Sequence, residues 1–203
     1  MIKLGDIALK LEAYRRYIIS ALGWVVFGMI FGSMICLGNA LILFGLKASI
    51  GFYTLVFVIF PSFLGGVVLN RFWKYYLFME KTVKKRWKKG ILLFCLPFAL
   101  FYGLVPLWWK VPPIYFATIW YPSLGAGFLL YWIYTRERTK ATLYSGIAIL
   151  LSVLVLVPLY RAKETFEILM ASQLLCAAMM MLVYFGIAIY IFFRAEELCL
   201  TKT

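Results

Sequence analysis

Long apolar stretches, separated by short polar segments, run along almost the whole chain. Six of these stretches contain no Asp, Glu, Lys or Arg, and each is close to or above the roughly 20 residues that an α-helix needs to cross a bilayer. The pattern therefore predicts an all-α integral membrane protein whose single polytopic domain, residues 1–203, is a bundle of six transmembrane helices. The six predicted spans are Ile18–Gly45, Ile50–Leu69, Ile91–Trp109, Ile114–Tyr134, Leu143–Tyr160 and Ile168–Phe193.

The segment before the first span carries apolar side chains at three- and four-residue spacing, which is typical of an amphipathic helix. The apolar stripe consists of Leu4, Ile7, Leu11 and Tyr14. Charged residues lie largely off this stripe. Residues 1–17 are therefore predicted to form an amphipathic entry helix in the headgroup plane, before the chain turns into the first two spans within 18–69.

A second amphipathic stretch, residues 70–90, lies between the second and third spans and is strongly basic. Its apolar stripe runs through Phe72, Tyr76, Met79, Val83 and Trp87. Its candidate binding residues are the cations Lys74, Lys81, Lys84, Lys85, Arg86, Lys88 and Lys89. One interpretation is a cytoplasmic helix that lies on anionic lipid, where each cation near the headgroups contributes about 1 kcal/mol. The other is a docking surface for an acidic cytoplasmic partner, and the two are compatible.

The charges also predict an orientation. The chain carries 21 Lys and Arg against 8 Asp and Glu, a formal net charge of +13. With a cytoplasmic N-terminus, six spans place 17 of the cations inside and 4 outside, and such an excess is the positive-inside signal of membrane proteins. Both termini, including the tail 194–203 that follows the spans of 91–193, are thus expected in the cytoplasm of a cell-membrane protein. Because the cations are interleaved with spans, nucleic acid is not an expected partner.

The composition argues against several classes of function. The chain is 65% hydrophobic and 14% charged, and it has no histidine, which is the commonest metal ligand and the usual general base. Its four cysteines form no CxxC pair, and Cys36, Cys95 and Cys176 lie in apolar runs where we expect small buried residues. No nucleotide-binding or hydrolase motif occurs. We therefore expect no enzyme activity and no catalytic, cofactor or metal site.

Strongly polar side chains are few within the predicted spans. None of them is ionisable, which argues against proton pumps, ion-coupled carriers and voltage sensors. Asn39, Thr118 and Gln173 fall at similar depth in the outer half of the membrane. They either line one outward-facing polar pocket or make hydrogen bonds between helices or to the backbone, such as one between Asn39 and Gln173.

Small residues predict where helices approach one another closely. Two pairs have the four-residue spacing of such contacts, Gly28 with Gly32 and Ser123 with Gly127. They are expected to pack within the bundle, with a homo-oligomer as the alternative. Prolines at or inside four of the spans are expected to bend their helices, and these are Pro61, Pro97, Pro106, Pro122 and Pro158.

The whole layout resembles that of ABC-2-type permeases. The shared features are an amphipathic entry helix, six spans, both ends inside and a helical cytoplasmic segment between the second and third spans. The resemblance implies a transport permease subunit energised by a separate cytoplasmic ATPase, which residues 72–89 would contact. The alternatives are a non-catalytic accessory or scaffold subunit of a membrane assembly, and a lipid-handling protein with a groove near Asn39, Thr118 and Gln173.

Overall fold

The computed structural model describes residues 4–44, 81–136, 139–161 and 165–200, and every element in these ranges is helical. The elements are α1 (Leu4–Leu43), α4 (Lys81–Ala99), the π-helical turn η2 (Leu100–Leu104), α5 (Val105–Trp108), α6 (Pro113–Thr118), α7 (Trp120–Thr135), α8 (Ala141–Ser152), the 3-10 turn η3 (Val153–Leu156), α9 (Val157–Arg161) and α10 (Phe166–Leu200).

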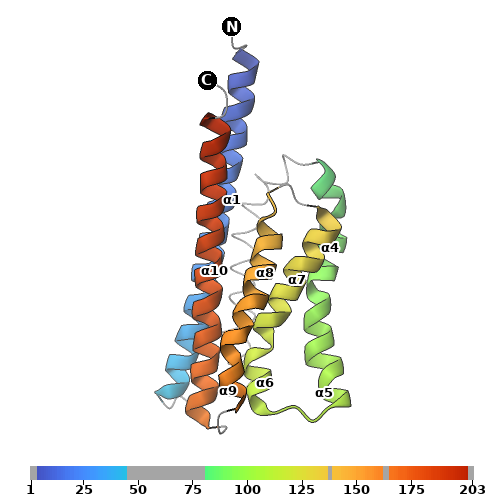
Figure 1. Ribbon diagram of the computed structural model, residues 1–203, viewed down its shortest axis with the longest axis vertical. Coiled ribbons are helices and arrows are strands. Elements are labelled where there is room, and N and C mark those ends of the chain that lie inside the picture. The colour runs from blue at the N-terminus through green and yellow to red at the C-terminus, as the bar shows by residue number, and fades with distance from the viewer. Residues whose placement is uncertain (1–3, 45–80, 137–138, 162–164, 201–203) are drawn as a thin grey trace.

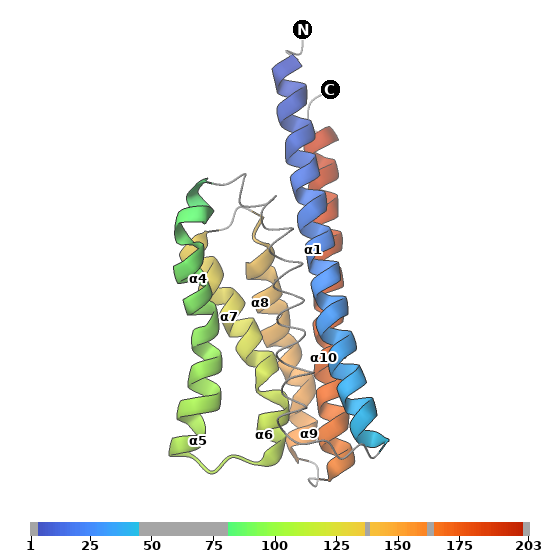
Figure 2. The ribbon, with the colours of Figure 1, turned by 180° about the vertical axis from the view of Figure 1, so that it is seen from behind.

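The helices run along one common axis, up and down the length of the bundle (Figure 1). Helices α1 and α10 are antiparallel neighbours, so the two chain termini lie at the same end, and the view from behind shows the same arrangement (Figure 2). We call this end the terminal end and the opposite one the distal end. Helix α7 lies between α4 and α8, and three interrupted columns, α4–α5, α6–α7 and α8–α9, stand beside the α1–α10 pair.

Four of the described helical segments are long and apolar enough to cross a membrane: Lys10–Leu43, Lys89–Trp108, Ala141–Arg161 and Phe166–Glu197. They coincide with the first, third, fifth and sixth predicted spans. The fourth predicted span is helical too, but it is divided at Ile119 into α6 and α7. The second predicted span lies outside the described residues.

The N-terminal segment is the clearest difference from the sequence prediction. Residues 4–17 do not form a separate entry helix but are the first part of α1, which continues as one helix of 40 residues. At about 1.5 Å per residue this helix is roughly 60 Å long, twice the thickness of the hydrocarbon core. The sequence from 11 to 21 contains no Gly or Pro, and Glu12 bonds Arg16 one turn later at 2.6 Å, so nothing interrupts the helix. Helix α1 therefore projects beyond the rest of the bundle, together with the end of α10 (Figure 1).

The basic segment differs in the same way. From Lys81 onward it is continuous with the third span, as the first turns of α4. These turns hold six of the seven predicted binding cations, Lys81, Lys84, Lys85, Arg86, Lys88 and Lys89, whereas Lys74 lies outside the described residues. Gly90 does not end the helix. Its missing side chain lets α4 pack closely against α7, because a Cβ there would lie 3.0 Å from the Tyr131 ring.

Glycines set the packing on both sides of the core. A Cβ at Gly28 would lie 3.1 Å from the Tyr184 ring, and one at Gly32 would lie 2.2 Å from the Met181 sulfur, so this small face is covered by α10. On α7, a Cβ at Gly127 would lie 2.6 Å from the Phe94 carbonyl oxygen of α4. Both predicted small-residue faces are thus used within the bundle, and Ser123 is buried there, with its hydroxyl donating to the Ile119 carbonyl at 2.6 Å.

The core between these helices is rich in aromatic residues. Tyr184 is fully buried and stacks edge-on against Trp24 and Phe128, which joins α10 to α1 and α7. Among the residues that the structure describes, its hydroxyl has no hydrogen-bond partner. Of the cysteines expected to be buried, only Cys176 is; Cys36 and Cys95 are exposed on their helices.

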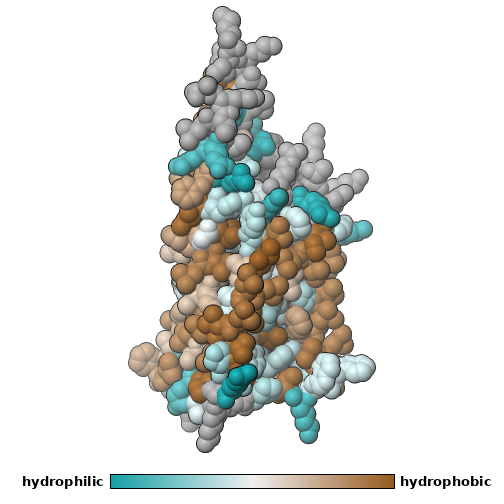
Figure 3. All heavy atoms as spheres, in the orientation of Figure 1, coloured by the Kyte–Doolittle hydropathy of each residue, from teal (hydrophilic) through white to brown (hydrophobic). Residues whose placement is uncertain are grey.

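The surface shows an apolar band between two polar levels (Figure 3). Exposed cations mark the levels, with Lys89, Arg136, Lys140 and Arg194 toward the terminal end and Lys110 and Arg161 at the distal end. Twenty-one residues separate Lys89 from Lys110 and Lys140 from Arg161, which is about 31 Å along a helix. This distance matches a bilayer core of about 30 Å.

Candidate functional site

All three interrupted columns break toward the distal end, and polar side chains cross between the columns there. We call this set of side chains the polar layer; it comprises Tyr102, Tyr115, Thr118, Tyr121, Ser152 and Tyr160. Tyr102 follows the end of α4, Tyr115, Thr118 and Tyr121 flank the break between α6 and α7, and Ser152 and Tyr160 flank η3. Of these residues only Thr118 was predicted from the sequence, because the tyrosines and Ser152 were not counted among the strongly polar side chains of the spans.

The first break is the π-helical turn η2. The Val105 N–H donates to the Leu100 carbonyl, five residues back, instead of to Phe101. The next residue, Pro106, has no N–H to offer in either register. The Phe101 carbonyl is therefore left without a donor in its own helix, and the Tyr115 hydroxyl of α6 donates to it at 2.7 Å. In return, the Tyr102 hydroxyl donates to the Phe116 carbonyl at 3.3 Å.

The second break separates α6 from α7. Pro122 lacks the N–H that would have bonded the Thr118 carbonyl, and the regular helix is interrupted at Ile119. The Thr118 side chain is fully buried; its hydroxyl donates to the Ile114 carbonyl at 2.9 Å and is also hydrogen-bonded to the Tyr160 hydroxyl of α9. The second column is thus tied to the third at its break.

The third break is the 3-10 turn η3. Pro158 cannot bond the Leu154 carbonyl, and the Val157 N–H donates to that carbonyl instead, three residues back, which tightens the helix. Just before this turn, Ser152 donates to the Ile149 carbonyl at 2.8 Å. The same hydroxyl meets the Tyr121 hydroxyl of α7 at 2.6 Å.

The predicted polar trio is not joined by hydrogen bonds within the described part of the chain. Thr118 belongs to the polar layer. Asn39 is 3% exposed, and its Nδ2 donates to the Ile35 carbonyl of its own helix at 2.8 Å, while its Oδ1 has no partner in the described part of the chain. Extending the antiparallel register of Gly32 against Met181 along α1 and α10 places Asn39 and the half-buried Gln173 at the same height.

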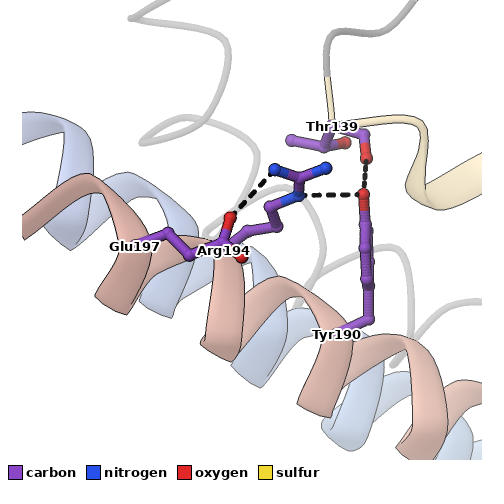
Figure 4. Close-up of polar contacts among 4 residues, drawn as sticks. All are labelled: Thr139, Tyr190, Arg194 and Glu197. Carbon is purple, nitrogen blue, oxygen red and sulfur yellow. Dashed lines mark hydrogen bonds and ion pairs between the residues drawn. The ribbon is translucent and has the colours of Figure 1, made fainter. Parts of the chain in front are cut away.

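A second polar cluster lies toward the terminal end, where the loop between α7 and α8 meets α10 (Figure 4). The Tyr190 hydroxyl donates to the Thr139 carbonyl at 3.4 Å and accepts from the Arg194 Nε at 3.4 Å. Arg194 also pairs with Glu197 at 2.9 Å. The loop starts and ends with left-handed residues, Arg136 at φ 53° and Lys140 at φ 54°. This cluster anchors the loop to α10 and presents cations at the membrane boundary.

The polar layer contains only neutral hydrogen-bonding groups. The cluster toward the terminal end adds the exposed charges of Arg194 and Glu197. No group of three or more potential metal-ligating side chains occurs in the part of the chain that the structure describes. In comparisons with protein families, curated proteins and solved structures, the chain shows no match.

Proposed function

We propose that this chain is the membrane-embedded subunit of a transport permease, ABC-2-like in layout, that a separate cytoplasmic ATPase energises. In this proposal the chain is a multi-pass protein of the cell membrane with six spans, and the terminal end faces the cytoplasm. The predicted second span completes the count.

The observation that carries the proposal is the length of α1. Its N-terminal part continues as helix about 16 Å beyond Arg15, where Ile7 and Leu11 are exposed. A continuous helix transmits displacement along its axis, so a cytoplasmic protein that contacts this end is mechanically connected to the bundle core. The basic first turns of α4 begin at the same end and add a second contact surface.

Two further features agree with an external energy source. The predicted spans contain no ionisable residue that could couple transport to an ion gradient. The distal end has three interrupted columns, and discontinuous helices are a common feature of transporters. A scaffold subunit also needs no ionisable residue in its spans, but it gives no reason for the three interrupted columns. A lipid-handling groove at the predicted trio has less support, because Asn39 and Thr118 are buried and Thr118 is hydrogen-bonded.

The test is affinity isolation of the full chain from its native membranes in mild detergent, with photolabelling of co-isolated proteins by an ATP analogue. We expect a nucleotide-binding subunit to co-isolate in a fixed ratio. Replacing Lys84, Lys85, Lys88 and Lys89 with Gln should reduce its recovery several-fold.

The matched control replaces Lys110 and Arg161 with Gln, which removes cations from the distal end. This control should leave the recovery unchanged. Isolation of a discrete complex without a nucleotide-binding subunit would contradict the proposal and favour the scaffold alternative.

A further inference from the structure

The distal segments of the three columns are short and weakly connected to their own helices. Beyond the breaks, α5 has 4 residues, α6 has 6 and α9 has 5. Each break lacks at least one regular main-chain hydrogen bond because of Pro106, Pro122 or Pro158. Helices α1 and α10 have no such interruption within their bounds. Bending at the three breaks therefore sacrifices fewer hydrogen bonds than bending within α1 or α10.

The links of the polar layer hold these weak points together. Two links join the first column to the second, through Tyr115 to the Phe101 carbonyl and Tyr102 to the Phe116 carbonyl. Two more join the second column to the third, through Thr118 with Tyr160 and Tyr121 with Ser152. All four links use neutral hydroxyl groups, which can exchange partners without moving charge into the membrane.

Behind the polar layer lies Cys176 of α10, with no exposed surface. It belongs to the same buried cluster as Tyr121 and Leu156 of η3. Leu159 of α9 packs against this cluster, so displacement of the distal segments would loosen the cover of the thiol.

We propose that the distal segments α5, α6 and α9 form a gate that swings on the three helix breaks and that the polar layer latches in the closed state seen here. The straight α1–α10 pair is the frame against which the gate closes. As the exit of a transport path, the gate rests on the proposed function, but its opening does not require a partner or a substrate.

The test uses the natural thiol. In a full-length protein with Cys36→Ser, Cys95→Ser and Cys199→Ser, reconstituted in lipid nanodiscs, the rate of Cys176 modification by N-ethylmaleimide reports opening. We expect slow modification, accelerated several-fold by Tyr115→Phe or Tyr160→Phe and at least tenfold by both together. The matched control is Tyr190→Phe. It removes a tyrosine hydroxyl that donates a hydrogen bond to a carbonyl near the terminal end, and it should leave the rate of Cys176 modification unchanged.

Unchanged rates in the latch variants, or an equal acceleration in the control, would overturn the gate. If the latch variants fail to fold, hydrogen–deuterium exchange of the unmodified chain decides. Residues 100–108, 113–121 and 153–160 should exchange together and faster than residues 170–180 of α10, and equal protection would overturn the proposal. A normal gate in a protein that binds no ATPase would refute only the proposed function.

Discussion

The contact between Gly127 and the Phe94 carbonyl gives a quantitative test of the packing of α7 on α4. In Gly127→Ala the new Cβ would lie 2.6 Å from that oxygen, whereas close carbon–oxygen contacts begin at about 3.3 Å. The oxygen belongs to the backbone of α4, so no side chain can rotate away. The two helices must separate by most of the roughly 0.7 Å difference.

Overpacking of this kind costs about 1–3 kcal/mol. The higher helix propensity of alanine returns up to about 1 kcal/mol, so we expect Gly127→Ala to lose about 1–2 kcal/mol of unfolding free energy. The matched control is Gly186→Ala on α10, where a Cβ meets nothing within 4 Å. The control should be neutral or more stable.

Stability can be measured by SDS titration in mixed micelles, followed by the fluorescence of the 7 tryptophans. Gly32→Ala provides an intermediate case, because its Cβ would meet the flexible side chain of Met181. The order of stability should be Gly186→Ala, then Gly32→Ala, then Gly127→Ala. A Gly127→Ala protein as stable as the unmodified chain would refute the close approach of α7 to α4.

Three further predictions follow from single contacts and use simple measurements. Thr118→Val and Tyr160→Phe each remove one hydroxyl of a hydrogen-bonded pair, so each should cost about 0.6–1.7 kcal/mol in the SDS titration; their double variant should cost less than the sum, and additive losses would show that the pair is not coupled. Asn39→Leu should leave stability unchanged or raise it, since Oδ1 has no partner among the described residues; a clear loss would reveal an unrecognised polar contact. Epitope tags at the two termini should be digested from the same side of sealed vesicles, and digestion from opposite sides would contradict the antiparallel α1–α10 pair.

Hydropathy predicted the positions of the four described helical segments that are long enough to cross a membrane, because a run without charges has few alternatives. It was not sufficient to predict where helices stop. The stripe of Leu4, Ile7, Leu11 and Tyr14 has the same spacing in a helix that lies on the membrane and in one that continues into α1. The spacing does not show whether the helix is continuous with the first span, and Ile7 and Leu11 stay exposed along the continuous α1.

The candidate site was predictable only in part for a related reason. The prolines mark three breaks, and Thr118 marks the depth of the polar layer. However, the donor to the Phe101 carbonyl, Tyr115, follows it by 14 residues, and Tyr160 follows Thr118 by 42. Helical periodicity gives depth along one helix but not the direction in which a side chain points relative to another column. Asn39, Gln173 and Thr118 were therefore grouped because they lie at similar depth. The structure shows that Thr118 is hydrogen-bonded to Tyr160 and to neither of the other two.

The paired ends of α1 and α10 also have a practical use. A 23.5 kDa membrane protein offers little mass outside the micelle for particle alignment in electron cryomicroscopy. Here two helices leave the bundle side by side, one at each end of the sequence. A soluble domain inserted through uninterrupted helical joints to both would be held at two points and could not rotate freely, which would provide a rigid marker for imaging.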